Sequence, residues 1–530
     1  MYQLAFFVLV PVTLYLAFGK KGKKDHKHQA DDAGSDASDT EFYEKQKVHF
    51  VEDDGNYVNT LKKELDADLP HFNTLRNVAT NNVKGCDYLG TKLGNETWLF
   101  PVSQQDLKEL YSMTGVDGKM ESFPFNQAVG YAPRGMPFIK STEHWKELRK
   151  AIAPIFHSDF MEAYFGYFHT AVKDLVQKWR ENNGKVVDIK KDICDMAYDS
   201  AVYTVTGAKL DVNVPYHSAD GIEELHIRDV NLKTLIDFSK HAATQEFCDD
   251  QEYRLKENSA CATRLNTNMG TLGGALTGLV EARAAQLADG AEPLKTIVDA
   301  AYGLIVAGKI DDVNEAVQSG WAILNGGHSN CGNALAATFY YLLKHPKVYS
   351  TLKKEIEDEL IKGNKLTEKN LEKVVTHESL HDLEYLSYVV KEALRLSTPI
   401  YGKPMKATED ITLESGFTVR KGTVVYPNNA IIGVSENIWE NPLEFIPERF
   451  DPESPHFKLP GGGKREPITW MPFGAGPRAC MGDNFSMYFV KVALVYFMHL
   501  FEFELQDVNH EEGFFYWLNE KSFNAKVKTI

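Results

Sequence analysis

A cysteine near the end of the chain stands in a setting that suits metal ligation. Cys480 lies in Phe-Gly-Ala-Gly-Pro-Arg-Ala-Cys-Met-Gly at residues 473–482, just before a helix-like apolar run over 485–501. The glycines and the proline predict a tight loop whose backbone can approach a flat ligand closely. Amides at the start of the following helix stabilise a thiolate, and Arg478 offers a forked cation to a carboxylate. A thiolate in such a loop suits the axial position of a haem iron.

The loop also resembles a known family. The spacing Phe-Gly-x-Gly-x-Arg-x-Cys-x-Gly is similar to the haem-binding loop of the cytochrome P450 superfamily at all six fixed positions, here Phe473, Gly474, Gly476, Arg478, Cys480 and Gly482. A lone cysteine is more often a buried free thiol, and it is this spacing that favours iron ligation. The resemblance implies haem b as cofactor and Cys480 as the iron ligand. It also implies Phe473, Gly474, Gly482 and Arg478 as haem contacts.

Other family motifs stand upstream in the expected order. Glu392 and Arg395 match the family's Glu-x-x-Arg, and Arg449 lies in a Pro-Glu-Arg-Phe run. Residues three apart share a helix face, so Glu392 and Arg395 can pair and jointly hold Arg449. Alone, such a pair would be a solvated helix pair. The resemblance implies a buried charge network behind the haem, and it implies that Trp145 and Arg149 face a haem propionate.

The helix expected on the other face of the haem departs from the family pattern. Residues 316–343 are apolar enough for a buried helix, yet Gly326, Gly327 and Gly332 cost about 1 kcal/mol each against alanine. We expect these glycines to let a ligand approach the backbone. Ser329 takes the family's usual acid position and Asn330 the usual threonine position, so both are the expected catalytic residues. A carboxamide cannot act as an acid near neutral pH, although it can hold water or a ligand.

The asparagine leaves two enzyme classes open. Some sterol hydroxylases of the superfamily carry asparagine here, which implies a monooxygenase acting on a hydrophobic lipid, sterol or xenobiotic with O2 and NADPH-cytochrome P450 reductase. Prostacyclin synthase and the allene oxide synthases also use asparagine near this point, and they rearrange lipid peroxides without O2 or a reductase. Pro477 and Arg478 resemble ordinary monooxygenases, so we favour the first class. A haem-thiolate sensor would keep the same haem site and turn over nothing.

Two other positions near the site are unusual. Met405 stands where the family commonly has a propionate-binding arginine, and we expect Lys403 or Lys406 to compensate, with Lys406 as a cofactor contact. His328 lies within the distal stretch. We expect it to hydrogen-bond to a neighbour rather than to ligate the iron.

The fold implied by the resemblance is mainly α with a smaller β portion, and the haem lies between a long distal helix and the cysteine loop. Apolar spacing predicts helices over 145–156, 161–179 and 193–206, and alternation with turn signals predicts short strands over 409–425. The glycine-rich stretch 270–278 lacks a phosphate-loop lysine and is expected to be a flexible connection or a small-residue helix contact. Residues 461–465 are expected to form a surface loop.

The N-terminal residues predict membrane attachment. Residues 2–18 carry no charge and precede four lysines, which predicts an anchor over residues 1–19 with the body in the cytosol at the endoplasmic reticulum. A cleaved signal normally has its basic residues first. Small acidic residues predict a flexible linker over 20–45, which leaves 46–530 as the catalytic domain. Six scattered cysteines suit a reducing location, and the net charge of −16 gives no indication of nucleic-acid binding.

Overall fold

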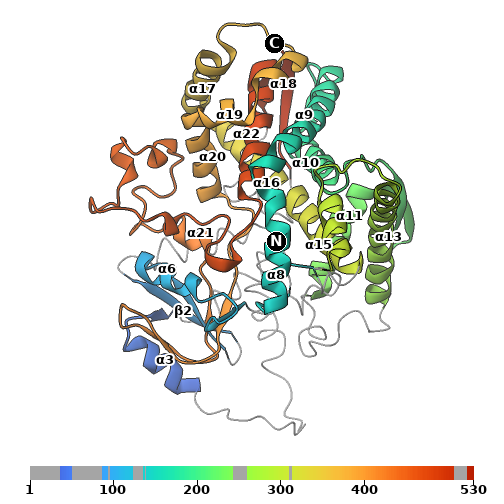
Figure 1. Ribbon diagram of the computed structural model, residues 1–530. Helices are drawn as coiled ribbons and strands as arrows, with labels where there is room; N and C mark the ends of the chain where they lie inside the picture. Colours follow the sequence, from blue (N-terminus) through green and yellow to red (C-terminus); the bar gives the residue numbers. More distant parts are fainter. Residues whose placement is uncertain are drawn as a thin grey trace.

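The computed structural model describes residues 36–50, 86–93, 96–122, 135–137, 139–242, 260–308, 313–506 and 522–530 (Figure 1). The anchor expected over residues 1–19 lies outside these ranges. Within them, no helix combines the length and the apolar character needed to span a membrane.

Helices make up most of the described chain, and a smaller sheet-rich part lies beside them, at the lower left of Figure 1. The fold is therefore mainly α with a smaller β portion, as the sequence predicts. The longer helices are α3 (Asp36–Glu44), α6 (Gln104–Ser112), α8 (Glu143–Ile152), α9 (Ser158–Glu181), α10 (Ile189–Thr206), α11 (Ile227–Ala242), α13 (Ala260–Ala288), α14 (Ile297–Val306), α15 (Val313–Asn325), α16 (Cys331–Lys344), α17 (Pro346–Glu355), α18 (Glu368–Val374), α20 (Glu384–Leu396) and α22 (Asp483–Leu500).

The largest sheet has the strand order β1-β2-β3-β11-β8-β4. Its strands are β1 (His49–Phe50), β2 (Tyr88–Leu93), β3 (Glu96–Pro101), β11 (Val424–Val425), β8 (Met405–Ala407) and β4 (Met120–Ser122). A second sheet pairs β12 (Phe501–Leu505) with β13 (Asn524–Thr529) and β5 (Val186–Asp188). The hairpin β6 (Asn213–His217) and β7 (Ile222–His226) and the pair β9 (Ile411–Thr412) and β10 (Thr418–Val419) complete the strands. The strands expected over 409–425 are therefore present as β9, β10 and β11.

The main apolar core joins α9, α10, α16, α20 and α22. Trp179 of α9 is fully buried, and its ring contacts Phe497 of α22 with ring centroids 4.7 Å apart. Phe485, near the start of α22, meets Phe168 of α9 edge to face at 4.8 Å. Aromatic pairs of this geometry add to the stabilisation from burial. The helix that follows the cysteine loop is thus held firmly in the core.

The predicted helices over 145–156, 161–179 and 193–206 correspond to α8, α9 and α10. The first of them changes to a 3-10 turn over Ala153–Phe156, where Pro154 cannot donate a helical hydrogen bond. α10 begins earlier than expected because Asp188 caps it by accepting from the amide of Lys191. It ends at Gly207, whose φ of +73° is a left-handed conformation that glycine adopts easily.

The glycine-rich stretch 270–278 is neither of the two things expected. It lies inside α13, so it is not a connection between elements. A Cβ added at any of its glycines would meet no described atom within 4 Å, so the glycines themselves make no close helix contact, and Leu272 and Leu276 are the residues of this stretch that pack in the core. The glycines of this stretch therefore lie within a continuous helix and do not form a turn.

Part of the segment expected as a flexible linker is folded. Residues 36–44 form α3, and Tyr43 is fully buried against the sheet. The Tyr43 hydroxyl accepts from the amide of Arg420 at 2.7 Å and bonds to the Thr423 hydroxyl at 2.7 Å. Arg420 also pairs with Asp39 at 2.6 Å. The small, acidic residues of this segment predicted a flexible linker. These long-range hydrogen bonds instead hold its last part in a folded helix.

Candidate functional site

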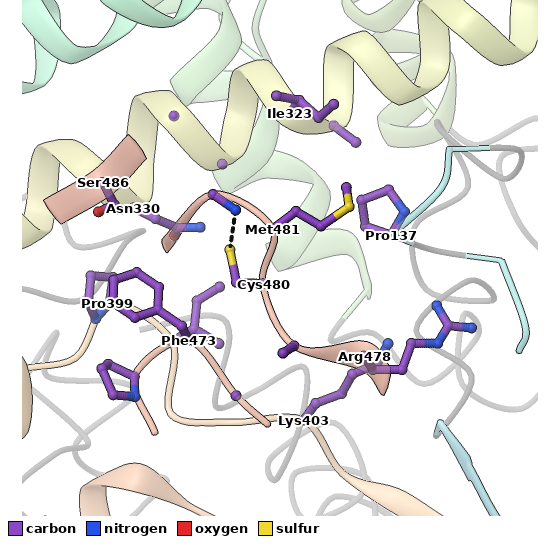
Figure 2. A pocket seen from close by; sticks show the side chains of 18 of the residues that line it. Pro137, Ile323, Asn330, Pro399, Lys403, Phe473, Arg478, Cys480, Met481 and Ser486 are labelled. Atoms are coloured by element: carbon purple, nitrogen blue, oxygen red, sulfur yellow. Dashed lines mark hydrogen bonds between the residues drawn. The ribbon is translucent and has the colours of Figure 1, made fainter. Parts of the chain in front are cut away.

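An apolar cavity of about 420 Å³ lies between the cysteine loop and the distal helix, which we define as α15, the π-helical turn Gly326–Asn330 and α16 (Figure 2). Ile323 and Asn330 line it from the helix, and Phe473 and Cys480 line it from the loop. Its size is in the range of small-molecule sites. The cavity therefore places the two sequence features singled out for chemistry opposite each other.

The Cys480 side chain is exposed and lines this cavity. Its amide donates to the Phe473 carbonyl at 2.8 Å, which closes the loop. The Gly482 amide donates to the sulfur at 3.3 Å (Figure 2). Burial raises the pKa of the Cys480 thiol, and this one amide only partly opposes that effect. The loop amides therefore do not outweigh the effect of burial on the thiol, although the sequence led us to expect that they stabilise a thiolate.

The glycines of the loop serve the turn itself. Gly476 has a φ of +68°, and a Cβ there would lie 2.3 Å from the Tyr111 carbonyl oxygen of α6. Gly474 also has a positive φ, +69°, and it lines the cavity. The loop conformation and its contact with α6 thus require Gly476, whereas Gly474 borders the ligand space.

Arg478 extends from the loop along the cavity wall. Its Nε donates to the Ser141 hydroxyl at 2.9 Å, and a terminal nitrogen donates to the Ile139 carbonyl at 2.6 Å. The guanidinium lies 4.0 Å from the ring centre of Trp145, a cation–π contact. Burial and the nearby Arg149 lower the pKa of Arg478 to about 10, so it stays cationic near neutral pH.

Trp145 and Arg149 share one face of α8, as their spacing predicts. Arg149 donates to the Ala479 carbonyl at 2.7 Å, next to the cysteine. Trp145 is buried, and its indole N–H has no hydrogen-bond partner among the described residues. Buried donors are nearly always paired. This end of the cavity therefore offers two cations and one unpaired donor to an anionic group.

Glu392, Arg395 and Arg449 meet in a fully buried cluster, as the motifs predict. Arg395 binds both carboxylate oxygens of Glu392, at 2.8 and 2.7 Å, and Arg449 reaches the same carboxylate at 3.1 Å. Arg395 also donates to the Pro442 carbonyl at 2.7 Å, and Arg449 to that of Asn441 at 2.7 Å. One carboxylate thus holds two arginines, and main-chain oxygens satisfy much of the rest.

Arg465 joins this cluster, and the sequence did not reveal it. Residues 461–463 are exposed, as expected of a surface loop, but Arg465 is buried and donates to the Arg449 carbonyl. Its guanidinium lies 4.0 Å from the ring centre of Trp439, and Arg395 lies 5.0 Å from the same ring. No spacing rule links a loop arginine to a tryptophan 26 residues earlier. The contact between Arg465 and Trp439 could therefore be found only in the structure.

Only one of the three glycines of the distal helix fits the expectation that they let a ligand approach the backbone. A Cβ at Gly327 would lie 2.8 Å from the Ala201 side chain of α10, and one at Gly332 would lie 3.0 Å from the Cys194 sulfur. Only Gly326 faces open space, and it lines the cavity. Two of the three glycines therefore permit close helix packing, and one leaves room for a ligand.

The expected catalytic pair lies in the π-helical turn, a feature often found at functional sites. The Ser329 hydroxyl is buried and donates to the Asn325 carbonyl at 2.9 Å. Asn330 lines the cavity, and its carbonyl oxygen has no hydrogen-bond partner among the described atoms. The asparagine is therefore the one of the two with polar capacity left for a ligand or water.

His328 points to the back of the distal helix, where it hydrogen-bonds to a neighbour as expected. Its Nδ1 lies 3.2 Å from the Asn231 amide nitrogen, which also donates to the Asn325 side chain at 2.8 Å. The ring meets Tyr198 edge to face at 5.0 Å. Burial lowers the pKa of His328 to about 3, so the imidazole is neutral. This side-chain network could not be predicted from the sequence, because Asn231 lies 97 residues before His328, on α11.

The two lysines near Met405 take different positions. Lys403 and Met405 line the cavity. Lys406 lies opposite Glu121 in the strand register and is not among the residues that line the cavity. Of the predicted cofactor contacts, the structure thus brings Trp145, Arg149, Phe473, Gly474, Arg478 and Gly482 to one cavity and leaves Lys406 outside it.

Comparisons with known proteins agree with this geometry. The model of the cytochrome P450 family matches residues 71–524. Similar proteins include cytochrome P450 4F6 of Rattus norvegicus, 27% identical over 67% of this chain and 64% of that protein. Cytochrome P450 82A2 of Glycine max is 37% identical over 30% of the chain and 28% of that protein, and cytochrome P450 4d10 of Drosophila mettleri is 23% identical over 78% of each. The first two alignments thus span less than two thirds of the relatives' own length. The match to the family model covers most of the chain, which therefore belongs to the cytochrome P450 family.

Proposed function

We propose that the protein is a haem-thiolate monooxygenase in which Cys480 ligates the iron of haem b, the cofactor of this family. The observation that carries the proposal is a thiol facing an apolar cavity whose wall also holds Arg149, Arg478 and the unpaired Trp145 N–H. Haem b is a flat apolar ring with two carboxylates, and these residues fit it. Phe473, Gly474 and Gly482 would border the ring.

The residues divide the work as follows. When bound, haem b supplies the iron chemistry that activates O2. Cys480 supplies the thiolate, and Arg149 and Arg478 offer cationic donors to the propionates. The buried Arg395 and Arg449, both bound to Glu392, fix the turn at Asn441 and Pro442 through main-chain bonds.

Asn330 and Ser329 are the proposed catalytic residues of the distal side. The unpaired carbonyl oxygen of Asn330 can hold a water molecule in the cavity. Since a carboxamide does not ionise near neutral pH, protons would come from that water and not from the side chain. Ser329 would position Asn330 through its bond to the preceding turn.

The substrate is proposed to be a hydrophobic lipid, sterol or xenobiotic, because the cavity wall is mostly apolar. The electron donor is proposed to be NADPH-cytochrome P450 reductase. The N-terminal anchor over 1–19, with the catalytic domain facing the cytosol at the endoplasmic reticulum, belongs to the same proposal and rests on the charge pattern of residues 1–24.

The test combines a spectrum with turnover. The reduced, carbon-monoxide-bound protein should show a thiolate-type Soret band. Substrate oxidation should require both NADPH and reductase. Loss of an added fatty-acid hydroperoxide without reductase, together with no reductase-dependent oxidation, would instead establish the peroxide isomerase. No turnover in either assay would leave a haem-thiolate sensor.

A further inference from the structure

Lys403 places a basic side chain in the wall of a mostly apolar cavity. It lies between α20 and β8, and in Figure 2 its side chain runs toward that of Arg478. Burial and the charge of Arg478 lower the pKa of Lys403 to about 7. Among the described residues, no carboxylate acts on Lys403 to offset these effects. A lysine rarely occupies such a position without an anionic partner.

Two other cations lie in the same region and also lack acids. The hydrogen-bond partners of Arg478 are a hydroxyl and a carbonyl, and that of Arg149 is a carbonyl. The described chain therefore gathers three cationic side chains around one end of the cavity with no carboxylate bound to any of them. Burying charge without a counter-charge is unfavourable. An anion bound in the cavity would remove that cost.

The backbone explains why Lys403, and not Lys406, has this role. In an extended chain, residues two apart lie on the same side and residues three apart lie on opposite sides. Lys403 and Met405 both line the cavity, while Lys406 lies in the register position opposite Glu121 of β4. Met405 supplies no charge. The cation that this segment gives to the cavity is therefore Lys403.

We propose that Lys403 binds a carboxylate inside this cavity. The inference deepens the proposed function and rests on it for the nature of the cavity. Two carboxylates could serve: a propionate of haem b, or the acid group of an amphiphilic substrate such as a fatty acid. In both cases the ammonium group donates to a carboxylate oxygen, a charge-assisted hydrogen bond.

The variants are Lys403→Met, which keeps the length and removes the charge, and Lys403→Arg, which keeps the charge. Lys406→Met is the matched control, since it makes the same change three residues away and outside the cavity. In the first arm, purified holoprotein is mixed with excess apomyoglobin and the rate of haem loss is followed, together with the propionate bending band in resonance Raman spectra. In the second arm, calorimetry measures binding of dodecanoate and of 1-dodecanol.

If the partner is a propionate, Lys403→Met should speed haem loss about tenfold or more and shift the propionate band. If the partner is a substrate acid, Lys403→Met should weaken dodecanoate binding about tenfold or more and leave 1-dodecanol unchanged. Lys403→Arg should behave mostly like the wild type in both arms because it keeps the positive charge. Lys406→Met should match the wild type.

The proposal is overturned if Lys403→Met changes neither arm, and a higher Tm for that variant would then show that the lysine is only a cost to folding. Failure of the proposed function is a separate result. A protein without a thiolate Soret band would refute haem-thiolate chemistry, whereas wild-type behaviour of Lys403→Met in a protein that shows the band would refute only the role of Lys403.

Discussion

The two walls of the cavity are held in different ways. Behind the cysteine loop, side chains of opposite charge and main-chain carbonyls bind Glu392, Arg395 and Arg449 at 2.7–3.1 Å. The distal helix instead packs through glycine and carboxamide contacts, and Asn330 keeps an unpaired oxygen. The first wall matches the family motifs throughout, and the second departs from them. Under the proposed function, the first wall would hold the cofactor in place, and the second wall would determine which reaction takes place there.

The largest effect should come from the cysteine itself. We expect Cys480→Ala to abolish the thiolate Soret band of the reduced carbon-monoxide complex, because no other described thiol takes its position in the loop. The matched control is Cys331→Ala, since Cys331 is buried and lines the same cavity from the distal helix. A thiolate band that survives in Cys480→Ala and vanishes in Cys331→Ala would reverse the assignment of the walls.

The next effect should come from the charge cluster. Arg449→Ala removes one of the two arginines that bind the buried Glu392 carboxylate, which costs about 3–5 kcal/mol. We expect little haem-loaded protein from this variant and a lowered Tm, measured by absorbance per protein and by thermal unfolding. Lys464→Ala is the control because Lys464 lies in the nearby loop with its side chain exposed. Wild-type yield and Tm for Arg449→Ala would show that this wall does not depend on the cluster.

Asn330 tests the distal wall. If its carbonyl oxygen only holds a water molecule, Asn330→Thr should keep or raise reductase-dependent oxidation. If its carboxamide orients a peroxide, the same change should lower the isomerase rate about 100-fold. Haem content should match the wild type in both cases, since Asn330 lies across the cavity from Cys480. Unchanged rates in both assays would mean that Asn330 has only a packing role and takes no part in catalysis.

The smallest effect concerns the network behind the distal helix. Burial lowers the pKa of His328 to about 3, whereas the unfolded chain takes up that proton near pH 6.5. The folded state is therefore fully favoured above pH 6.5 and loses up to about 1.4 kcal/mol per pH unit as the pH falls from 6.5 toward 3.

Urea unfolding at pH 7 and pH 5.5 checks this. We expect the wild type to lose more stability between the two values than His328→Gln, which keeps an amide near Asn231 and cannot titrate. His381→Gln replaces an exposed histidine and should behave as the wild type. Equal losses in all three proteins would mean that His328 takes up its proton in the folded state as easily as in the unfolded chain.

Sequence reasoning succeeded where a motif is local. Residues 473–482 and the Glu-x-x-Arg spacing lie on one loop and one helix, so their geometry follows from a few neighbouring residues. It failed where partners come from distant segments. Arg465 with Trp439, Asn231 with His328, and the choice of Lys403 over Lys406 each depend on how separate elements meet. The glycines of the distal helix were assigned to ligand access because packing against α10 cannot be read from one helix alone.

The helix α3 has a practical consequence. Tyr43 and Asp39 bind Arg420 and Thr423, residues about 380 positions later, so the early residues cover the segment between β10 and β11. A shortened version of the chain intended for crystallisation should therefore begin before Asp36. A start at residue 46, the boundary that composition suggests, would remove Tyr43 and expose Thr423 and one face of Phe417 to solvent, which should lower the stability of the protein.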